Sequence, residues 1–136
     1  MLHLSVATGK RCEMRDITQD LRALVRRNAV EQGWQEGALA LFCPHTTCGL
    51  TINEGADPDV AHDMLDFFSK LVPESGAYRH AEGNSDAHIK ASLFGASLLL
   101  LVEGGELRLG TWQAVYLCEG DGPRRRKLWA QWLPAG

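Results

Sequence analysis

Apolar and polar residues alternate at the start of the chain, where Leu2, Leu4 and Val6 occupy every second position. This period is typical of a β-strand with one buried face. A second strand is predicted for residues 11–17. Residues 37–43 are apolar at successive positions, which is the pattern of a central strand covered on both faces. We therefore expect sheet structure early in the chain.

Three further segments have the apolar period of an amphipathic helix. The first lies between Thr18, predicted as its cap, and Gly33, predicted as its stop. The second begins at Asp57 and Pro58, because the carboxylate can accept from free amides and proline at the first helical position loses no needed donor. Its apolar stripe is predicted to face the core and comprises Val60, Met64, Phe67, Phe68 and Leu71. A third, shorter helix follows a long loop and ends at Gly95.

The rest of the chain is predicted to be β-structure. Strands are expected over residues 50–53, 97–103, 107–119 and 124–133, with glycine-rich turns after the second and third of them. The sequence contains no internal repeat. These elements predict an α+β fold: an antiparallel β-sandwich-like sheet system with about three flanking helices, in a single domain over residues 1–136.

Composition narrows the class of protein. The chain has 136 residues, of which 45% are hydrophobic and 23% charged, with a formal net charge of −3. These values argue against disorder and against a nucleic-acid binder. No apolar run reaches the roughly 18 residues that a membrane helix needs, so we expect a cytoplasmic protein without membrane contact. The four cysteines show no C-x-x-C pairing, which argues against a zinc ribbon and favours reduced thiols.

The first polar segment with candidate chemistry covers residues 45–58. His45 follows the predicted central strand, at a position where side chains commonly converge on a ligand, although a structural hydrogen bond is the plainer interpretation. Hydroxyl donors follow at Thr46, Thr47 and Thr51, and acceptors follow at Asn53, Glu54 and Asp57. Together these groups could hold a hydrated magnesium ion and its phosphate partner.

The second polar segment surrounds the start of the third helix. His80, Asn84 and His88 fall within nine positions. Histidines eight apart can meet a common ligand, but this is not a recognised zinc spacing. The plainer interpretation makes Asp86 a helix cap and Lys90 a solvated charge.

The third polar segment contains a basic run near the end of the chain. Arg124 and Arg126 would project from the same face of a strand and could clamp a phosphate, or they could guard a solvated edge strand. Trp112 either stacks on a ring of a ligand or fills the core. Cys43 and Cys48 are expected to be small buried residues rather than nucleophiles.

In order along the chain, these segments resemble the sequence signatures of the YjbQ family, whose members are also described as secondary thiamine-phosphate synthases. The matching motifs are H-T-T-x-G-L-T-I-N-E-x-x-D-P-D-V from His45, H-D-M from His62, Y-x-H from Tyr78, D-A-H-I-K-A-S-L-x-G from Asp86, L-G-T-W-Q from Leu109 and E-x-D-G-P-R-R-R from Glu119. Six ordered motifs are far more specific than any one of them, and they leave only the first helix region poorly covered.

The resemblance implies a compact antiparallel β-sandwich-like domain with flanking helices that associates as a homotrimer. It also implies an activity that joins a pyrimidine methyl diphosphate to a thiazole phosphate and releases diphosphate. The residues that family members share correspond here to His45, Asn53, Glu54, Asp57, Asp63, His80, His88, Thr111, Trp112, Gln113 and Arg124. Cys48 departs from the family, in which alanine or serine is common at this position, and residues 84–86 shorten the usual loop.

We therefore expect a transferase that stabilises charge on a departing diphosphate. Catalytic roles are assigned to His45, His88 and Asp63. Binding of the phosphorylated substrate is assigned to Thr46, Thr47, Asn53, Glu54, Thr111, Trp112, Gln113, Arg124 and Arg126. A magnesium ion would be held by Asp57 or Asp63. The hypothesis requires His45, His88 and Arg124 to meet in one pocket.

Two other function classes stay open at this point. In a metal-dependent hydrolase, His45, His80 and His88 would hold a transition metal around an activated water. In a non-catalytic binding protein, the same groups would retain a phosphorylated metabolite or a partner chain without turnover.

Overall fold

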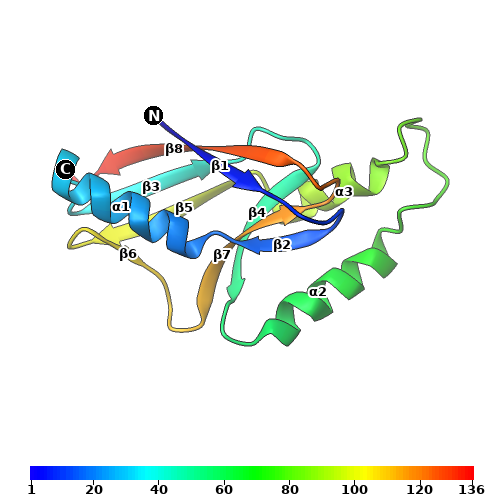
Figure 1. Ribbon diagram of the computed structural model, residues 1–136, viewed down its shortest axis with the longest axis horizontal. Helices are drawn as coiled ribbons and strands as arrows, with labels where there is room; N and C mark the ends of the chain where they lie inside the picture. The colour runs from blue at the N-terminus through cyan, green and yellow to red at the C-terminus, as the bar shows by residue number, and fades with distance from the viewer.

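The larger of two sheets forms one layer of the protein. The structure is a computed structural model that describes residues 1–136. Five antiparallel strands follow the order β1-β8-β3-β5-β6 (Figure 1). Their bounds are Leu2–Ala7 for β1, Arg125–Pro134 for β8, Gly37–Phe42 for β3, Ser97–Glu103 for β5 and Glu106–Arg108 for β6. The apolar run at residues 37–43 is thus confirmed as a central strand, but the prediction that both faces are covered is wrong: Leu39 and Leu41 are fully buried, whereas Phe42 on the opposite face is 44% exposed.

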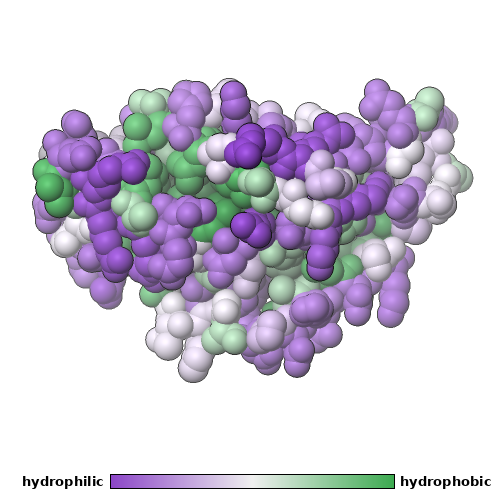
Figure 2. Space-filling view, viewed as in Figure 1, coloured by the Kyte–Doolittle hydropathy of each residue, from purple (hydrophilic) through white to green (hydrophobic).

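A smaller sheet packs against the larger one. Its three strands follow the order β2-β7-β4, with bounds Glu13–Asp16, Gln113–Glu119 and Cys48–Glu54. A core cluster of 18 buried residues joins the two sheets, with Leu39 and Leu100 from the larger and Leu50 and Leu117 from the smaller. On the face that carries α1, apolar surface concentrates between α1 and β1 (Figure 2). The predicted α+β class, with antiparallel sheets and three helices, is confirmed.

Helix α1, Thr18–Gln32, supplies part of this core. Leu21 and Val25 are fully buried, and the helix ends at Gly33, whose φ of 72° lies in the left-handed region that favours glycine. The prediction of Thr18 as the cap is wrong. Its hydroxyl instead accepts from the Val115 N–H at 2.9 Å, which ties the first turn of α1 to β7.

Helix α2, Pro58–Leu71, begins as predicted, because Asp57 Oδ1 accepts from the Asp59 N–H at 3.0 Å. The prediction that its apolar stripe faces the core is wrong. No residue of α2 is buried, and Phe67 is 61% and Leu71 56% exposed. In Figure 1 the helix lies below β2 at the edge of the smaller sheet, where Phe68 packs against Phe94 of α3 with ring centroids 4.9 Å apart. The apolar period of residues 60–71 therefore correctly predicted an amphipathic helix, but much of its apolar face is exposed in the single chain.

Helix α3, Ser85–Phe94, lies against β4 and β7. The predicted strand over residues 107–119 is interrupted, because Gly110 and Gln113 form a turn in which the Gln113 N–H donates to the Gly110 carbonyl at 3.1 Å. The strand predicted over residues 11–17 shortens to β2, and β4 begins earlier, at Cys48. None of the three helices is long and apolar enough to cross a membrane.

Candidate functional site

Three of the polar segments meet at one end of the smaller sheet. The Gly120 N–H, in the turn after β7, donates to the Thr47 carbonyl oxygen at 3.1 Å. A Cβ on Gly120 would lie 3.0 Å from the Cβ of Ala87, so the start of α3 closes on the same turn. We call this region the His45 end and define it by His45, Thr46, Thr47, Asn84, His88, Asp121 and Arg124.

His45 bonds to the backbone of Lys127, a residue of β8. The pairing of β3 with β8 ends at Phe42 and Trp129, so β3 does not pair with Lys127. The Nε2 atom of His45 fills this gap, 3.0 Å from the Lys127 nitrogen and 3.1 Å from its carbonyl oxygen. Burial, and then the positive charge of Arg126, lower the pKa of His45. The imidazole is therefore neutral at pH 7, and Nδ1 is its ring nitrogen without a partner in the chain.

Arg126 lies in the interior. It is 3% exposed; its Nε donates to Glu119 Oε1 at 2.8 Å, and its Nη2 donates to the other oxygen of Glu119 and to the Thr47 hydroxyl. Burial alone would raise the pKa of Glu119, but the hydrogen bonds from Arg126 and Thr8 hold it below its ordinary value. The predicted clamp of two arginines on a phosphate is not formed, because Glu119 already occupies the guanidinium of Arg126.

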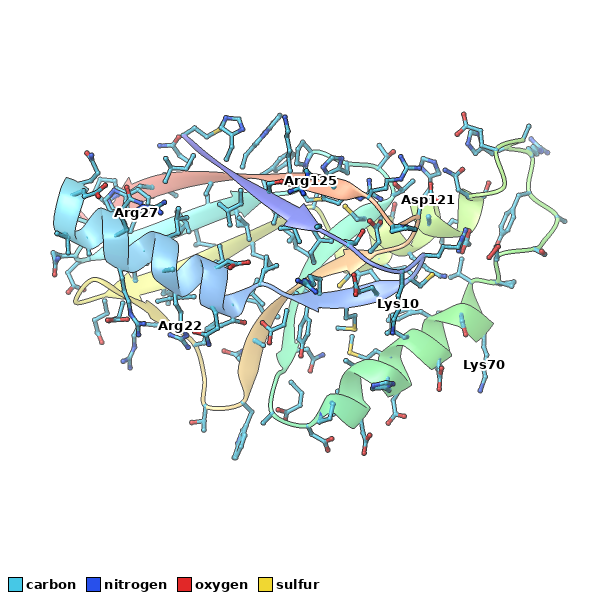
Figure 3. All side chains as sticks on the ribbon, in the orientation of Figure 1. Lys10, Arg22, Arg27, Lys70, Asp121 and Arg125 are labelled. Carbon is cyan, nitrogen blue, oxygen red and sulfur yellow. The ribbon has the colours of Figure 1, made fainter.

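Arg124 remains at the surface beside the start of α3. Its Nε and Nη2 donate to the Asp121 backbone oxygen at 2.7 Å and to the Asp121 carboxylate at 2.9 Å. The same carboxylate accepts from Asn84 Nδ2 at 2.9 Å, so Asp121 links Arg124 to the residue preceding α3. Figure 3 shows Asp121 beside α3. The side chain of Arg124 is 53% exposed, and its Nη1 has no partner in the chain.

His88 approaches His80 rather than His45. The two rings meet edge to face with centroids 5.4 Å apart, and both line a hollow of about 340 Å³ with Tyr78 and Arg79. His45 does not line this hollow. No three His, Cys, Asp or Glu side chains of the chain are placed to hold a metal ion. The predicted ligand set of His45, His80 and His88 is therefore not assembled within one chain.

The remaining predicted residues gather at the opposite end of the smaller sheet. We call this the Trp112 end and define it by Asn53, Glu54, Thr111, Trp112 and Gln113. Glu54 pairs with Gln113 across β4 and β7, and the Gly55 N–H donates to the Trp112 carbonyl at 2.8 Å. Trp112 is 65% exposed, which excludes a role in filling the core. A hollow of about 230 Å³ beside it is lined by Asp16, Arg22, Thr111 and Gln113 among others.

The two ends are separated by the length of β4. This strand runs from Cys48 to Glu54, and at about 3.3 Å per residue its ends lie roughly 20 Å apart. The structure therefore brings the loop of His45, Arg124 and the start of α3 to one end, with the His88 ring against His80, and leaves the Trp112 end outside that site. The predicted pocket that contains His45, His88 and Arg124 together is not formed within one chain. One pocket containing all the predicted residues is not formed within a single chain.

The implied magnesium site does not fit the residues of one chain. Asp57 caps α2 next to the Trp112 end, and Asp63 is exposed farther along the helix. Asp57 Oδ1 already accepts from the Asp59 N–H, and neither carboxylate belongs to a group of three His, Cys, Asp or Glu side chains that could hold a metal ion.

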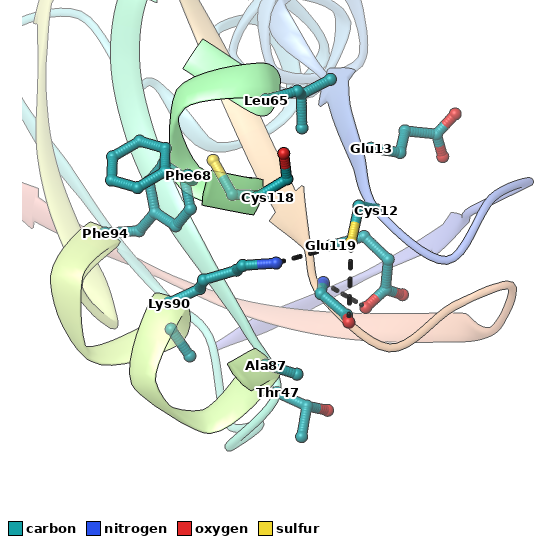
Figure 4. Close-up of a pocket in the computed structure, with 13 residues that line it drawn as sticks. Cys12, Glu13, Thr47, Leu65, Phe68, Ala87, Lys90, Phe94, Cys118 and Glu119 are labelled. Carbon is teal, nitrogen blue, oxygen red and sulfur yellow. Dashed lines mark hydrogen bonds between the residues drawn. The ribbon is translucent and has the colours of Figure 1, made fainter. Parts of the chain in front are cut away.

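Sequence reasoning missed a buried cluster beneath α3. Asp86 is fully buried and accepts from Arg11 at 3.0 and 2.9 Å and from Lys90 at 3.1 Å. Burial alone would raise the pKa of Asp86, but these two cations hold it below its ordinary value. Lys90 reaches across a small enclosed cavity to within 3.8 Å of the Cys12 sulfur (Figure 4). Asp86 is therefore not a cap and Lys90 is not solvated; their spacing of four residues was the available signal.

Comparison with known proteins identifies the family. Residues 2–135 match the family described as UPF0047 protein YjbQ-like. The UPF0047 protein YugU of Bacillus subtilis is 49% identical over 131 residues, which cover 96% of each chain. The UPF0047 protein YjbQ of Escherichia coli O157:H7 is 48% identical over 86 residues, which cover 61% of this chain and 62% of that protein.

Solved structures have the same fold. An uncharacterised YjbQ/UPF0047 family protein of Clostridium acetobutylicum superposes with a TM-score of 0.89 at 47% identity, covering 98% of this chain and 100% of the other. A conserved hypothetical protein of Thermus thermophilus gives a TM-score of 0.88 at 46% identity, with the same coverage. None of these names states an activity. The match to the family model and to YugU confirms the family part of the resemblance, and the thiamine-phosphate synthase part stays a prediction. The chain belongs to the UPF0047 (YjbQ-like) family.

Proposed function

We propose that the protein is a transferase that binds a pyrimidine methyl diphosphate at the His45 end and joins the pyrimidine to a thiazole phosphate, releasing diphosphate. One observation supports this proposal. His45, Arg124 and the start of α3 come from three distant parts of the chain and lie together at the His45 end of the smaller sheet. The free Nη1 of Arg124 and the free Nδ1 of His45 are available there to a phosphate oxygen.

The chemistry depends on stabilising negative charge. As the bond to the departing diphosphate breaks, charge accumulates on its oxygens, and fixed positive donors lower the energy of that state. Arg124 supplies such a charge, and Asp121 holds its orientation. His45 is neutral because its pKa is lowered, so its free Nδ1 can form a hydrogen bond to the substrate without adding a charge to the site. Arg126 acts as a positioning residue, since it holds the Thr47 hydroxyl of the loop that carries His45.

The activity is tested with both phosphorylated precursors and magnesium in solution. We expect thiamine phosphate and diphosphate to form in equal amounts, measured by mass spectrometry. Arg124→Ala is expected to lower the rate roughly a hundredfold, as for loss of one charge-stabilising donor. Arg125→Ala is the matched control, because the neighbouring arginine is also exposed but bonds to Ser5 on β1.

Several outcomes separate the alternatives. Thiamine phosphate formed equally fast by wild type and Arg124→Ala would contradict the proposed role of this end. Stabilisation of the fold by diphosphate without any product would instead identify a non-catalytic binding protein. Both measurements use the complete chain, and circular dichroism of each variant checks that it folds.

We also propose that the protein assembles as a homotrimer through the outer face of the larger sheet. Leu99 and Leu101 of β5 are each 60% exposed, beside Phe42 and Leu133 at 44%. Leu101 pairs with Ala38 of β3, and Ala38 pairs with Leu133 of β8, so these side chains share the face opposite the core. A contiguous apolar face of this kind marks an interaction surface. The copy that covers it is proposed to be another molecule of the same chain.

Sedimentation analysis tests the assembly. The native protein is expected to sediment at three times the chain mass of 15.0 kDa. The double variant Leu99→Glu, Leu101→Glu is expected to sediment as a monomer, because each subunit would bring two charges into the apolar contact. Val30→Glu is the control, since Val30 is exposed on α1, away from this face. A wild-type monomer at micromolar concentration would contradict the proposal.

A further inference from the structure

Two buried thiols touch at the base of the loop that carries His45. Cys43 and Cys48 are each 2% exposed, and their sulfur atoms lie 3.4 Å apart. Both are free thiols. A disulfide bond is about 2.05 Å long, so an approach of roughly 1.4 Å would join them.

The backbone holds this pair in place from both sides. The Cys43 N–H donates to the Ala96 carbonyl at 2.7 Å, and the Leu50 N–H donates to the Gly95 carbonyl at 2.9 Å. The ends of β3 and β4 are therefore fastened to the same short segment before β5. The four residues between the cysteines, 44–47, form the loop that can absorb the remaining movement.

We propose that Cys43 and Cys48 form a reversible disulfide on exposure to a hydroperoxide, and that this bond tightens the loop carrying His45 and Thr47. The proposal does not depend on the transferase activity. The alternative is that the two thiols stay reduced as small packing residues of the core. Disulfides of intracellular proteins are usually transient and redox-sensing, which is the class proposed for this pair.

The chemistry balances with hydrogen peroxide as the oxidant. Cys43 is the first nucleophile, because the hydrogen bond from the Cys48 thiol lowers its pKa. Its thiolate attacks one peroxide oxygen, breaking the O–O bond to give a sulfenic acid and, with one proton, water. The Cys48 sulfur then attacks the Cys43 sulfur and displaces the hydroxyl as a second water. Two thiols and one peroxide thus become one disulfide and two waters.

The other two cysteines provide internal controls. Cys118 is as buried as the pair, and Cys12 is partly exposed beside Lys90. Neither has a sulfur–sulfur contact like that of Cys43 and Cys48. Geometry, rather than exposure alone, therefore selects the pair that should react.

The full-length protein is treated with hydrogen peroxide, unfolded in an alkylating reagent and digested for mass spectrometry. We expect two of the four thiols to be lost, one peptide pair linked through Cys43 and Cys48, and recovery of all four thiols after reduction. Cys48→Ser should abolish the link, while Cys118→Ser should keep it. Retention of four thiols, a link to Cys12 or Cys118, or a sulfinic or sulfonic acid at Cys43 would overturn the proposal.

The effect on the loop is read by NMR of the imidazole rings. The His45 ring signals are expected to shift between the reduced and oxidised protein, whereas those of His3, on the outer face of β1, should not. In Cys48→Ser, peroxide should leave the His45 signals unchanged. A disulfide that forms without moving them would overturn the proposed coupling to the loop.

Discussion

Replacement of Arg126 by methionine is expected to lower the free energy of unfolding by about 3–5 kcal/mol, because it leaves the buried Glu119 without its counter-charge. Glu119 is 4% and Arg126 3% exposed, and the two side chains share two hydrogen bonds. Glu119 would keep donors from Thr8 and from the Gly120 and Asp121 N–H groups, but none of these carries a charge. Urea unfolding at neutral pH, followed by circular dichroism, measures the loss.

Two comparisons isolate the ion pair. The double variant Arg126→Met, Glu119→Gln should recover much of the loss, since no charge remains buried. Arg125→Met, at an exposed neighbour, should stay within about 0.5 kcal/mol of wild type. A loss below about 1 kcal/mol for Arg126→Met alone would mean that Glu119 is not desolvated as its burial indicates.

The sign of the pH dependence provides a further check on the same variant. The folded pKa of Glu119 lies below its ordinary value, so its stabilising contribution is present at neutral pH and is lost as pH falls through that folded pKa. In Arg126→Met, burial without the cation should raise the pKa of Glu119. Protonation then relieves the buried charge, and the stability gap between variant and wild type should narrow as the pH is lowered.

Local patterns account for much of the fold. The alternation at residues 2–6, the apolar run at residues 37–43 and the Asp57 cap each predict a structure that is formed as expected. Each of these signals depends on a few neighbouring residues and on backbone geometry. Predictions of this kind therefore do not depend on how the rest of the chain folds.

Signals that depend on distant partners were less reliable. The stripe on α2 shows that one side of the helix is apolar but not what covers it, and within this chain little does. The motif that begins at His45 runs along β4, so His45, before the strand, and Glu54, its last residue, lie at opposite ends of that strand. That separation could have been inferred from strand length, and it explains why the predicted site divides into the His45 end and the Trp112 end.

Apart from the i, i+4 spacing of Asp86 and Lys90, the sequence contains no local signal for which charged side chains are buried. Arginine, aspartate and lysine are rarely buried unless they are paired, so Arg126, Asp86 and Lys90 were expected at the surface. Their partners Glu119 and Arg11 are contributed by other parts of the sequence. The folded arrangement of β7, β8, α3 and the segment before β2 decides the pairing, and no local period reports it.

Replacement of Asp86 by asparagine is the second substitution expected to cost about 3–5 kcal/mol, because it removes the one negative charge between two cations. Asp86 is fully buried and Lys90 7% exposed, so Lys90 would be left beneath α3 without a counter-ion. The folded pKa of Asp86 is below its ordinary value, so this contribution is present at neutral pH and is lost as pH falls through that pKa. Urea unfolding at neutral pH measures the effect.

Asp20→Asn is the matched control for Asp86→Asn, since Asp20 also lies in the first turn of a helix but is exposed. There the loss should be limited to the interaction with the helix dipole, about 0.3–1 kcal/mol. The double variant Asp86→Asn, Lys90→Met should be more stable than Asp86→Asn alone, because the buried cation is removed together with its partner. If the double variant were the less stable of the two, Lys90 would be stabilised by groups other than Asp86, and the cluster beneath α3 would not be an ion-paired core.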